Sequence, residues 1–395
     1  MDENLRQLLA IVRCVLNNEA YDEPINDDKR LFIIAQENGL SGLIAPVLRP
    51  HQLSPKIYSL FQQTFLQYTA RDIRQQQAIQ ELNQLFNENG IKHIFLKGSY
   101  LKKLYPASYM RSMGDIDILV TEDELPVVHQ ILEKHGYINT TNSYQHDSFK
   151  KGKDIYIEIH PRLTSSFRDK YIELFNNLWE HTYLVDKYEY QFKPEFNLVY
   201  LLYHMAKHFS TSGVGLRTIL DIGIFTKYHN DLDLEYLNSL LDISKLRLFF
   251  QNILYLNKLY FDYNYLEYYL KDYKIDEVFI TELTNYIIIA GVHGHGKDFN
   301  MNLSGMITKS LDTGSIKKGK FAYILTILFP SLKNMKGRYQ FLNKYPFLLP
   351  LAWIFRFIRL LFKKTKASFI RLKQLLRVSD QEINKNYELF KKLGL

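Results

Sequence analysis

The segment GDIDILV, residues 114–120, places two aspartates in an otherwise apolar run. Side chains alternate between the two faces of a β-strand, so Asp115 and Asp117 would share one face. Ile116 and Ile118 would then point into a core. Two like charges beside a core are costly unless a cation pairs with them, and carboxylate oxygens are the ligands that hard divalent cations prefer. The segment therefore predicts a strand that carries a cation site on one face.

A later segment offers a third acid. In DIYIEIH, residues 154–160, isoleucines form one face of an alternating strand, and Tyr156, Glu158 and His160 form the other. If this strand neighbours the first, Glu158 reaches the same cations and can also accept a proton from an acceptor hydroxyl, with His160 at the rim. Carboxylates converging in this way suit two Mg²⁺ ions about 3.5–4 Å apart, which hold the attacking and leaving oxygens of a phosphoryl or nucleotidyl transfer.

A candidate phosphate site precedes the aspartates. Lys97 and Gly98 close a predicted strand, IKHIFLKG, and Ser99 opens a predicted helix, SYLKKLY. A helix N-terminus with a glycine that permits close backbone approach suits a phosphate, and the Ser99 hydroxyl can donate to it. Lys97 and Arg111 are candidates to neutralise a triphosphate, although Arg111 could equally be a surface charge. Taken alone, the paired aspartates could be a solvated strand edge, and the Gly-Ser could be a common helix cap. Their order along the chain favours a functional site over these structural explanations.

The apolar periodicity divides the chain into helical and mixed blocks. Residues 1–88 predict helices, among them a long amphipathic one that opens at Ser54, and residues 89–193 alternate short strands with helices. Residues 194–330 predict helices again, and residues 331–395 a basic helical segment. We therefore expect an α+β fold, in which a small mixed-sheet domain is embedded between helical regions.

Further candidates follow the predicted sheet. His204 and His208 are four residues apart on one predicted helix, LVYLLYHMAKHF, and either line a cleft or simply pack. Zinc is disfavoured there, because neither the glutamate of the metalloprotease signature nor a cysteine accompanies them. Arg217 and Asp221 have the same spacing and could form an intrahelical ion pair. The glycine-rich segment 291–300, which holds two histidines, predicts a turn.

The segments LKGSYLKKLYP, RSMGDIDILV and IEIH together resemble the DNA polymerase β-like nucleotidyltransferase superfamily, and more narrowly a bacterial family of uncharacterised nucleotidyltransferases. The resemblance implies that Asp115 and Asp117 are metal ligands, that Glu158 is the third acid, and that Gly98 and Ser99 contact the nucleotide phosphates. It also favours counting the cleft candidates among the site residues, which are His204, His208 and Asp221.

The resemblance implies a reaction as well. We expect Mg²⁺-dependent transfer of a nucleoside monophosphate from a nucleoside triphosphate, with ATP as the first candidate donor. The acceptor would be an unknown small molecule or peptide in natural-product or polysaccharide biosynthesis. Two alternatives stay open. One is a toxin-like transferase that modifies protein or RNA, and the other is a non-catalytic nucleotide-binding protein.

The basic residues are concentrated near the C-terminus. Residues 313–379 hold fifteen Lys and Arg and no acid, so the net charge of +8 leaves −7 for the remainder. This favours a local docking surface for phosphates, acidic protein or anionic lipid over nucleic acid as a partner. Residues 345–377 are too often interrupted by charges and proline to span a bilayer. They predict either a surface helix that inserts Trp353 and Phe357 into a membrane or a helix packed on the protein itself.

The predicted location follows from two further observations. Cys14 is the only cysteine, which excludes an internal disulfide, and the N-terminal residues lack the profile of a secretion signal. We therefore expect a cytoplasmic protein with at most a weak, salt-sensitive attachment to the inner membrane surface.

Overall fold

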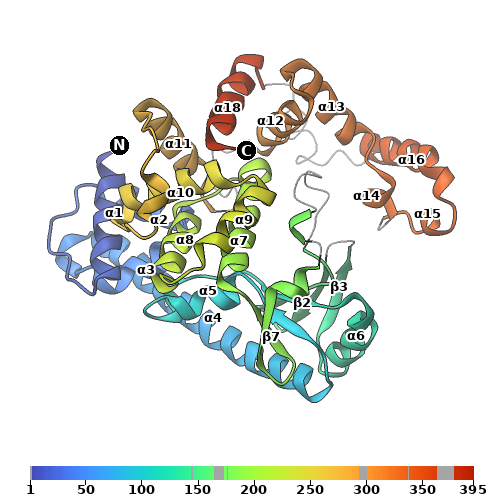
Figure 1. Cartoon of the computed structure of the whole chain (residues 1–395), viewed down its shortest axis with the longest axis horizontal. Helices are drawn as coiled ribbons and strands as arrows, with labels where there is room; N and C mark the ends of the chain where they lie inside the picture. Colours follow the sequence, from blue (N-terminus) through green and yellow to red (C-terminus); the bar gives the residue numbers. More distant parts are fainter. Residues whose placement is uncertain are drawn as a thin grey trace.

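A seven-stranded mixed sheet lies at one end of the molecule and helices make up the rest, so the predicted α+β class is confirmed (Figure 1). The structure is a computed structural model that describes residues 2–143, 146–163, 173–175, 177–292, 300–336, 338–362 and 378–395. The strand order is β3-β4-β5-β2-β1-β7-β6. The strands are β1 (His93–Phe95), β2 (Ile116–Val120), β3 (Ile138–Asn142), β4 (Asp147–Lys151), β5 (Ile155–His160), β6 (Thr182–Asp186) and β7 (Glu189–Phe192).

The pairing of β2 with β5 brings the two acidic segments together. These strands are parallel, and their register places Asp117 opposite Glu158. β1 is antiparallel to β2 and parallel to β7, and the remaining neighbours are antiparallel. The predicted neighbourhood of the two strands is therefore present in the sheet.

One face of the sheet is covered by α4 (Pro55–Glu88) and α6 (Leu125–Lys134). Ile116 and Ile118 of β2 are fully buried there with Ile157 and Ile159 of β5, as the alternation predicts. The long helix begins at a proline, which suits the first helical position because the missing N–H has no intrahelical acceptor there. The acids of β2 and β5 must then lie on the opposite face.

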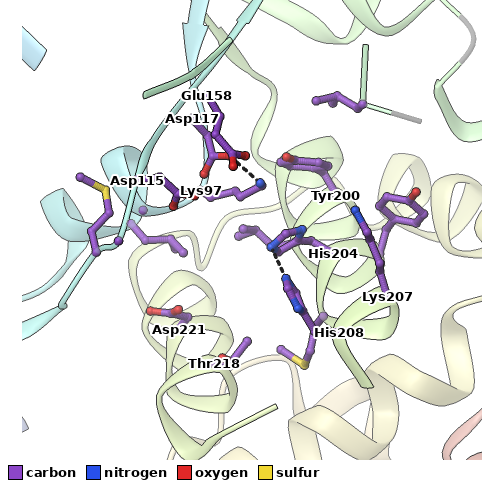
Figure 2. A pocket seen from close by; sticks show the side chains of 18 of the residues that line it. Lys97, Asp115, Asp117, Glu158, Tyr200, His204, Lys207, His208, Thr218 and Asp221 are labelled. Atoms are coloured by element: carbon purple, nitrogen blue, oxygen red, sulfur yellow. Dashed lines mark hydrogen bonds and ion pairs between the residues drawn. The ribbon is translucent and has the colours of Figure 1, made fainter. Parts of the chain in front are cut away.

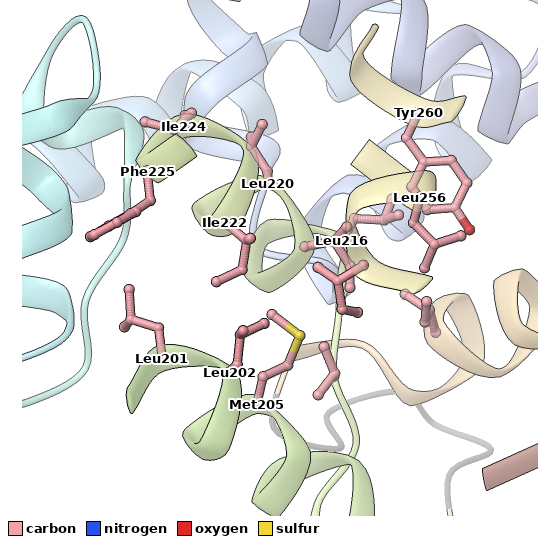
Figure 3. Packing of buried hydrophobic residues seen from close by; sticks show 14 of the residues in the cluster. Leu201, Leu202, Met205, Leu216, Leu220, Ile222, Ile224, Phe225, Leu256 and Tyr260 are labelled. Carbon is pink, nitrogen blue, oxygen red and sulfur yellow. The ribbon is translucent and has the colours of Figure 1, made fainter. Parts of the chain in front are cut away.

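That opposite face meets a helical layer built around α7 (Pro194–Thr211), α8 (Leu216–Tyr228) and α10 (Arg247–Phe261). Figure 3 shows Leu202 and Met205 of α7 lying towards α8, in a single apolar core. The same core takes in Leu5 near one end of the chain and Leu393 near the other. The other helices are α1 (Glu3–Leu16), α2 (Asp28–Glu37), α3 (Ser41–Ile44), α5 (Gly98–Leu101), α9 (Leu234–Ser244), α11 (Glu277–Ala290), α12 (Met301–Thr313) and α18 (Asp380–Leu393). The predicted division into four regions stays a prediction.

An arm of helices extends from α12 away from this core (Figure 1). It consists of α13 (Ile316–Leu328), α14 (Leu332–Lys336), α15 (Phe341–Lys344) and α16 (Leu349–Phe362). The last three share a small core around Met335, Leu342 and Ala352, whereas Ile324 and Ile327 of α13 pack against the main core. Within the described residues, no helix combines the length and the apolar character needed to cross a membrane. Most of the predicted turn at 291–300, and residues 363–377 of the predicted surface helix, lie outside the described residues.

Candidate active site

Three carboxylates converge where β2 and β5 meet the helical layer (Figure 2). Asp115 immediately precedes β2, Asp117 lies within it, and Glu158 is opposite on β5. Each contributes an oxygen, and these oxygens lie within 4.8 Å of one another. Only 5% of Asp117 is exposed, whereas Asp115 and Glu158 are half-buried. The sheet register thus produces an all-oxygen cluster that opens on one side.

Two positively polarised groups hold Asp117. The Lys97 ammonium donates to Asp117 Oδ1 at 2.7 Å, and His160 Nε2 lies 2.8 Å from the same oxygen. Lys97 has a φ of 44°, a region that residues with a Cβ rarely adopt and that clusters at functional sites. His160 was expected at the rim, but it is buried, because it continues the β5 ladder opposite Leu119 and so stays inside the sheet.

The charges of the cluster are unevenly balanced. Repulsion from Asp117, with burial and Glu158 adding to it, raises the pKa of Asp115 to about 7. Burial would also raise the pKa of Asp117, but Lys97 and His160 hold it well below its usual range. Burial acts the same way on Glu158, and a hydrogen bond with His160 keeps its pKa below the ordinary value. Asp115 is therefore the carboxylate that most lacks a positive partner.

A cavity of about 470 Å³ opens beside these acids, between the sheet and the helices α7 and α8. Such a volume is within the usual range of small-molecule sites. Both cationic and acidic side chains line it. The basic and acidic groups on its walls are Lys97, Arg111, Arg162, Lys207, Arg217, Asp115, Asp117, Glu158 and Asp221. This mixture suits a ligand that carries both phosphate and metal.

The predicted phosphate contacts are only partly directed at the cavity. Gly98 lines it, but Ser99 is 1% exposed, and its hydroxyl faces the Met113 sulfur at 3.7 Å. A Cβ on Gly98 would come within 2.6 Å of Arg111 Nη1 and of the same sulfur. The glycine is thus required by close packing, and the Ser99 contact with phosphate stays a prediction.

Arg111 and Asp221 form a buried, two-point ion pair. Arg111 Nη2 donates to Asp221 Oδ2 at 3.0 Å and Nε donates to Oδ1 at 3.2 Å, while the Tyr105 hydroxyl donates to Oδ1 at 2.8 Å. Asp221 raises the pKa of Arg111 against the effect of burial. Arg111 is therefore no surface charge, and Asp221 takes it as partner in place of the predicted Arg217.

One face of α7 forms a wall of the cavity (Figure 2). His204 and His208 contact each other through their Nε2 atoms at 2.9 Å, and His208 Nδ1 lies 2.6 Å from Ser212 Oγ. Both histidines line the cavity. Tyr200 and Lys207 share this face, and burial together with the nearby Lys97 lowers the pKa of Lys207.

The sequence reasoning missed several residues of the site. Tyr200 and Lys207 could have been found, because positions 200, 204, 207 and 208 follow helical spacing on one face. Arg217 has a buried Nε with no hydrogen-bond partner among the described residues, although its Nη1 donates to Ser112. His146 lies just before β4 and comes within 3.4 Å of Glu158. The sequence marked Arg217 only as a possible partner of Asp221, and no local signal marked His146.

Comparisons with known proteins add a family. A family model described as "Uncharacterised nucleotidyltransferase" matches residues 24–262, more than half of the chain. Among solved structures, the chain is similar to a tRNA nucleotidyltransferase crystallised with a primer tRNA and an incoming ATP analogue, at 14% identity over 78% of this chain and 97% of that one. The TM-score is 0.22, which is too low to indicate a shared fold. Comparison with curated proteins finds no match.

Proposed function

The chain belongs to the uncharacterised nucleotidyltransferase family, and on that premise we propose that it moves a nucleoside monophosphate from a nucleoside triphosphate to a small molecule or peptide, with Mg²⁺ required. Family membership makes it a nucleotidyltransferase; the metal, the nucleotide and the acceptor are the proposal. The observation that carries it is the convergence of Asp115, Asp117 and Glu158 on one cavity. The DNA polymerase β-like superfamily, ATP as nucleotide, bacterial origin and a cytoplasmic location stay predictions.

The donor set fits the proposed metal. All three proposed ligands offer carboxylate oxygens, which hard cations such as Mg²⁺ prefer. Asp117 already forms an ion pair with one cation, the Lys97 ammonium. The repulsion that raises the pKa of Asp115 is relieved by any added cation. We propose that the three acids hold two Mg²⁺ ions. When bound, the ions supply positive charge to the phosphates and to the departing pyrophosphate.

The remaining chemistry falls to the protein's own residues. Glu158 is a carboxylate at neutral pH, so it can accept the proton of the acceptor hydroxyl. The acceptor oxygen then bonds to the α-phosphorus as the bond to the pyrophosphate oxygen breaks. Lys97, Lys207 and Arg217, which line the cavity, would contact the triphosphate. Catalysis in this scheme rests on positioning and on charge neutralisation.

Incubation of the purified protein with each labelled nucleoside triphosphate, Mg²⁺ and extract of the producing cell tests the proposal. Label in a small product, with release of pyrophosphate, supports it. Label on protein or RNA indicates the toxin-like alternative, and nucleotide binding without turnover indicates a non-catalytic protein. Asp117→Asn should abolish turnover. Asp154→Asn is the matched control, because Asp154 pairs with Arg74 at the surface.

A further inference from the structure

Helix α16 presents a stripe of large apolar side chains to solvent. Leu351, Ile354, Phe355 and Ile358 are between 40% and 53% exposed. Their spacing of three, one and three residues places them on one face of the helix. A helix on the surface of a globular protein normally turns a polar face outward, so an outward apolar stripe indicates an unidentified partner.

The opposite face of α16 already packs on the protein. The Trp353 indole donates to the Pro330 carbonyl at 2.9 Å, and its ring meets Phe329 edge-on at 5.2 Å. Phe357 contacts the same phenylalanine. These contacts agree with the alternative in which the helix packs on the protein itself, and insertion of Trp353 and Phe357 into a membrane stays a prediction. α16 is apolar on its inner face and on its outer face.

Helix α13 repeats the pattern. Phe321, Leu325 and Leu328 are all exposed, and their spacing of four and three again defines one face. The two helices touch, since Arg356 of α16 donates to the Leu328 carbonyl at 3.1 Å. Two independent apolar stripes thus occur on adjacent helices of one arm.

The charge of this arm selects among partners. Residues 313–336 and 338–362 contain no Asp or Glu, whereas the chain outside the basic segment is net negative. Their basic residues are Lys317, Lys318, Lys320, Lys333, Lys336, Arg338, Lys344, Arg356 and Arg359. Basic amphipathic helices lie on anionic bilayers with apolar side chains among the acyl chains and cations at the headgroups. A symmetric dimer through the same face would instead bring two sets of cations together.

We propose that α13 and α16 form a docking surface for an anionic membrane. The apolar stripe of each helix, which begins at Phe321 in α13 and at Leu351 in α16, would insert into the membrane interface. The proposal is independent of the chemistry at the active site. It differs from the sequence-based expectation in the residues that insert and in the participation of α13. The arm would hold the protein at a bilayer without spanning it.

Sedimentation of the full chain with vesicles tests the surface. We expect binding to vesicles of phosphatidylglycerol mixed with phosphatidylcholine at low salt, and little binding to phosphatidylcholine alone. Ile354→Glu with Phe355→Glu should weaken binding on the order of 100-fold. Phe321→Glu with Leu325→Glu, in α13, should weaken binding to a similar extent. Agreement between the two variants would show that the loss of binding does not come from a local folding defect in one helix. Val278→Glu is the matched control, because this residue of α11 is apolar and 70% exposed but lies outside the arm.

A second pair of substitutions tests the charge. Lys344→Gln with Arg359→Gln should lower binding to the anionic vesicles by about fivefold for each cation removed, and high salt should act in the same direction. Failure of the wild type to sediment with anionic vesicles at low salt would overturn the proposal. Wild-type binding by both glutamate variants would also overturn it. A concentration-dependent dimer that the glutamate variants abolish, without vesicle binding, would assign the surface to self-association.

Discussion

Replacing Asp115 by asparagine should stabilise the ion-free protein at high pH. The pKa of Asp115 is about 7 in the folded protein, against an ordinary value of 3.8. Each pKa unit of difference between folded and unfolded chains corresponds to about 1.4 kcal/mol, so ionisation of Asp115 costs at most about 4 kcal/mol of unfolding free energy above pH 7. The side chain is partly exposed, and solvent screening brings the expected gain for Asp115→Asn to about 2 kcal/mol.

The gain depends on pH in a defined direction. Because the folded pKa lies above the unfolded one, the wild type binds the proton more tightly when folded and loses stability as the pH rises from about 4 to about 7. The asparagine variant has no proton to lose at this position. Its advantage should therefore be complete at pH 8, less than half as large at pH 5, and absent below about pH 4.

Guanidinium denaturation of both proteins, with chelator and with Mg²⁺, measures the effect. With chelator at pH 8 the variant should be the more stable one. At a Mg²⁺ concentration 100 times the dissociation constant, the wild type should gain about 2.7 kcal/mol and the variant far less. Asp154→Asn, which removes a surface ion pair, should change stability by less than about 1 kcal/mol. A variant that is less stable with chelator, or that gains as much from Mg²⁺, would refute the reasoning.

Three further substitutions separate chemistry, binding and folding. Glu158→Gln should lower turnover, measured by steady-state kinetics, by roughly 100- to 10,000-fold with a smaller change in triphosphate affinity. An unchanged turnover rate would show that Glu158 takes no part in the reaction. Lys207→Met should weaken triphosphate binding about tenfold in calorimetry because a cation leaves the cavity wall, and equal affinity would argue against that contact. Arg111→Met leaves Asp221 buried without its cationic partner, so it should cost roughly 3–5 kcal/mol of unfolding free energy; unchanged stability would show that the fold does not depend on this ion pair.

Local periodicity was sufficient for the elements that build the acidic cluster. Alternation in GDIDILV and DIYIEIH predicts two strands with acids on one face, and both strands are present with Ile116 and Ile157 buried. Other strands escaped notice. β3 and β4 contain few apolar residues, and β6 is largely exposed, so these strands are held by backbone hydrogen bonds that need no alternation of side chains.

Contacts between distant residues lay beyond the sequence pattern. Arg111 and Asp221 are 110 residues apart, and nothing local to either indicates the other. The motif around Ser99 predicts a phosphate ligand, but Met113 packs against its hydroxyl after the chain has turned back. Motif and spacing therefore predict which acids cluster, whereas tertiary packing decides which members of the motif face the cavity.

The ion pair between Lys97 and Asp117 has a consequence for how the protein matures in the cell. A site built only from carboxylates would have to await its metal before it could fold, as many small metal-binding domains do. Here the Lys97 ammonium from the neighbouring loop already balances the most buried of the three clustered carboxylates. If the site holds Mg²⁺ as proposed, the newly synthesised chain would not need the ion to balance this buried charge, and the ion could be bound after folding.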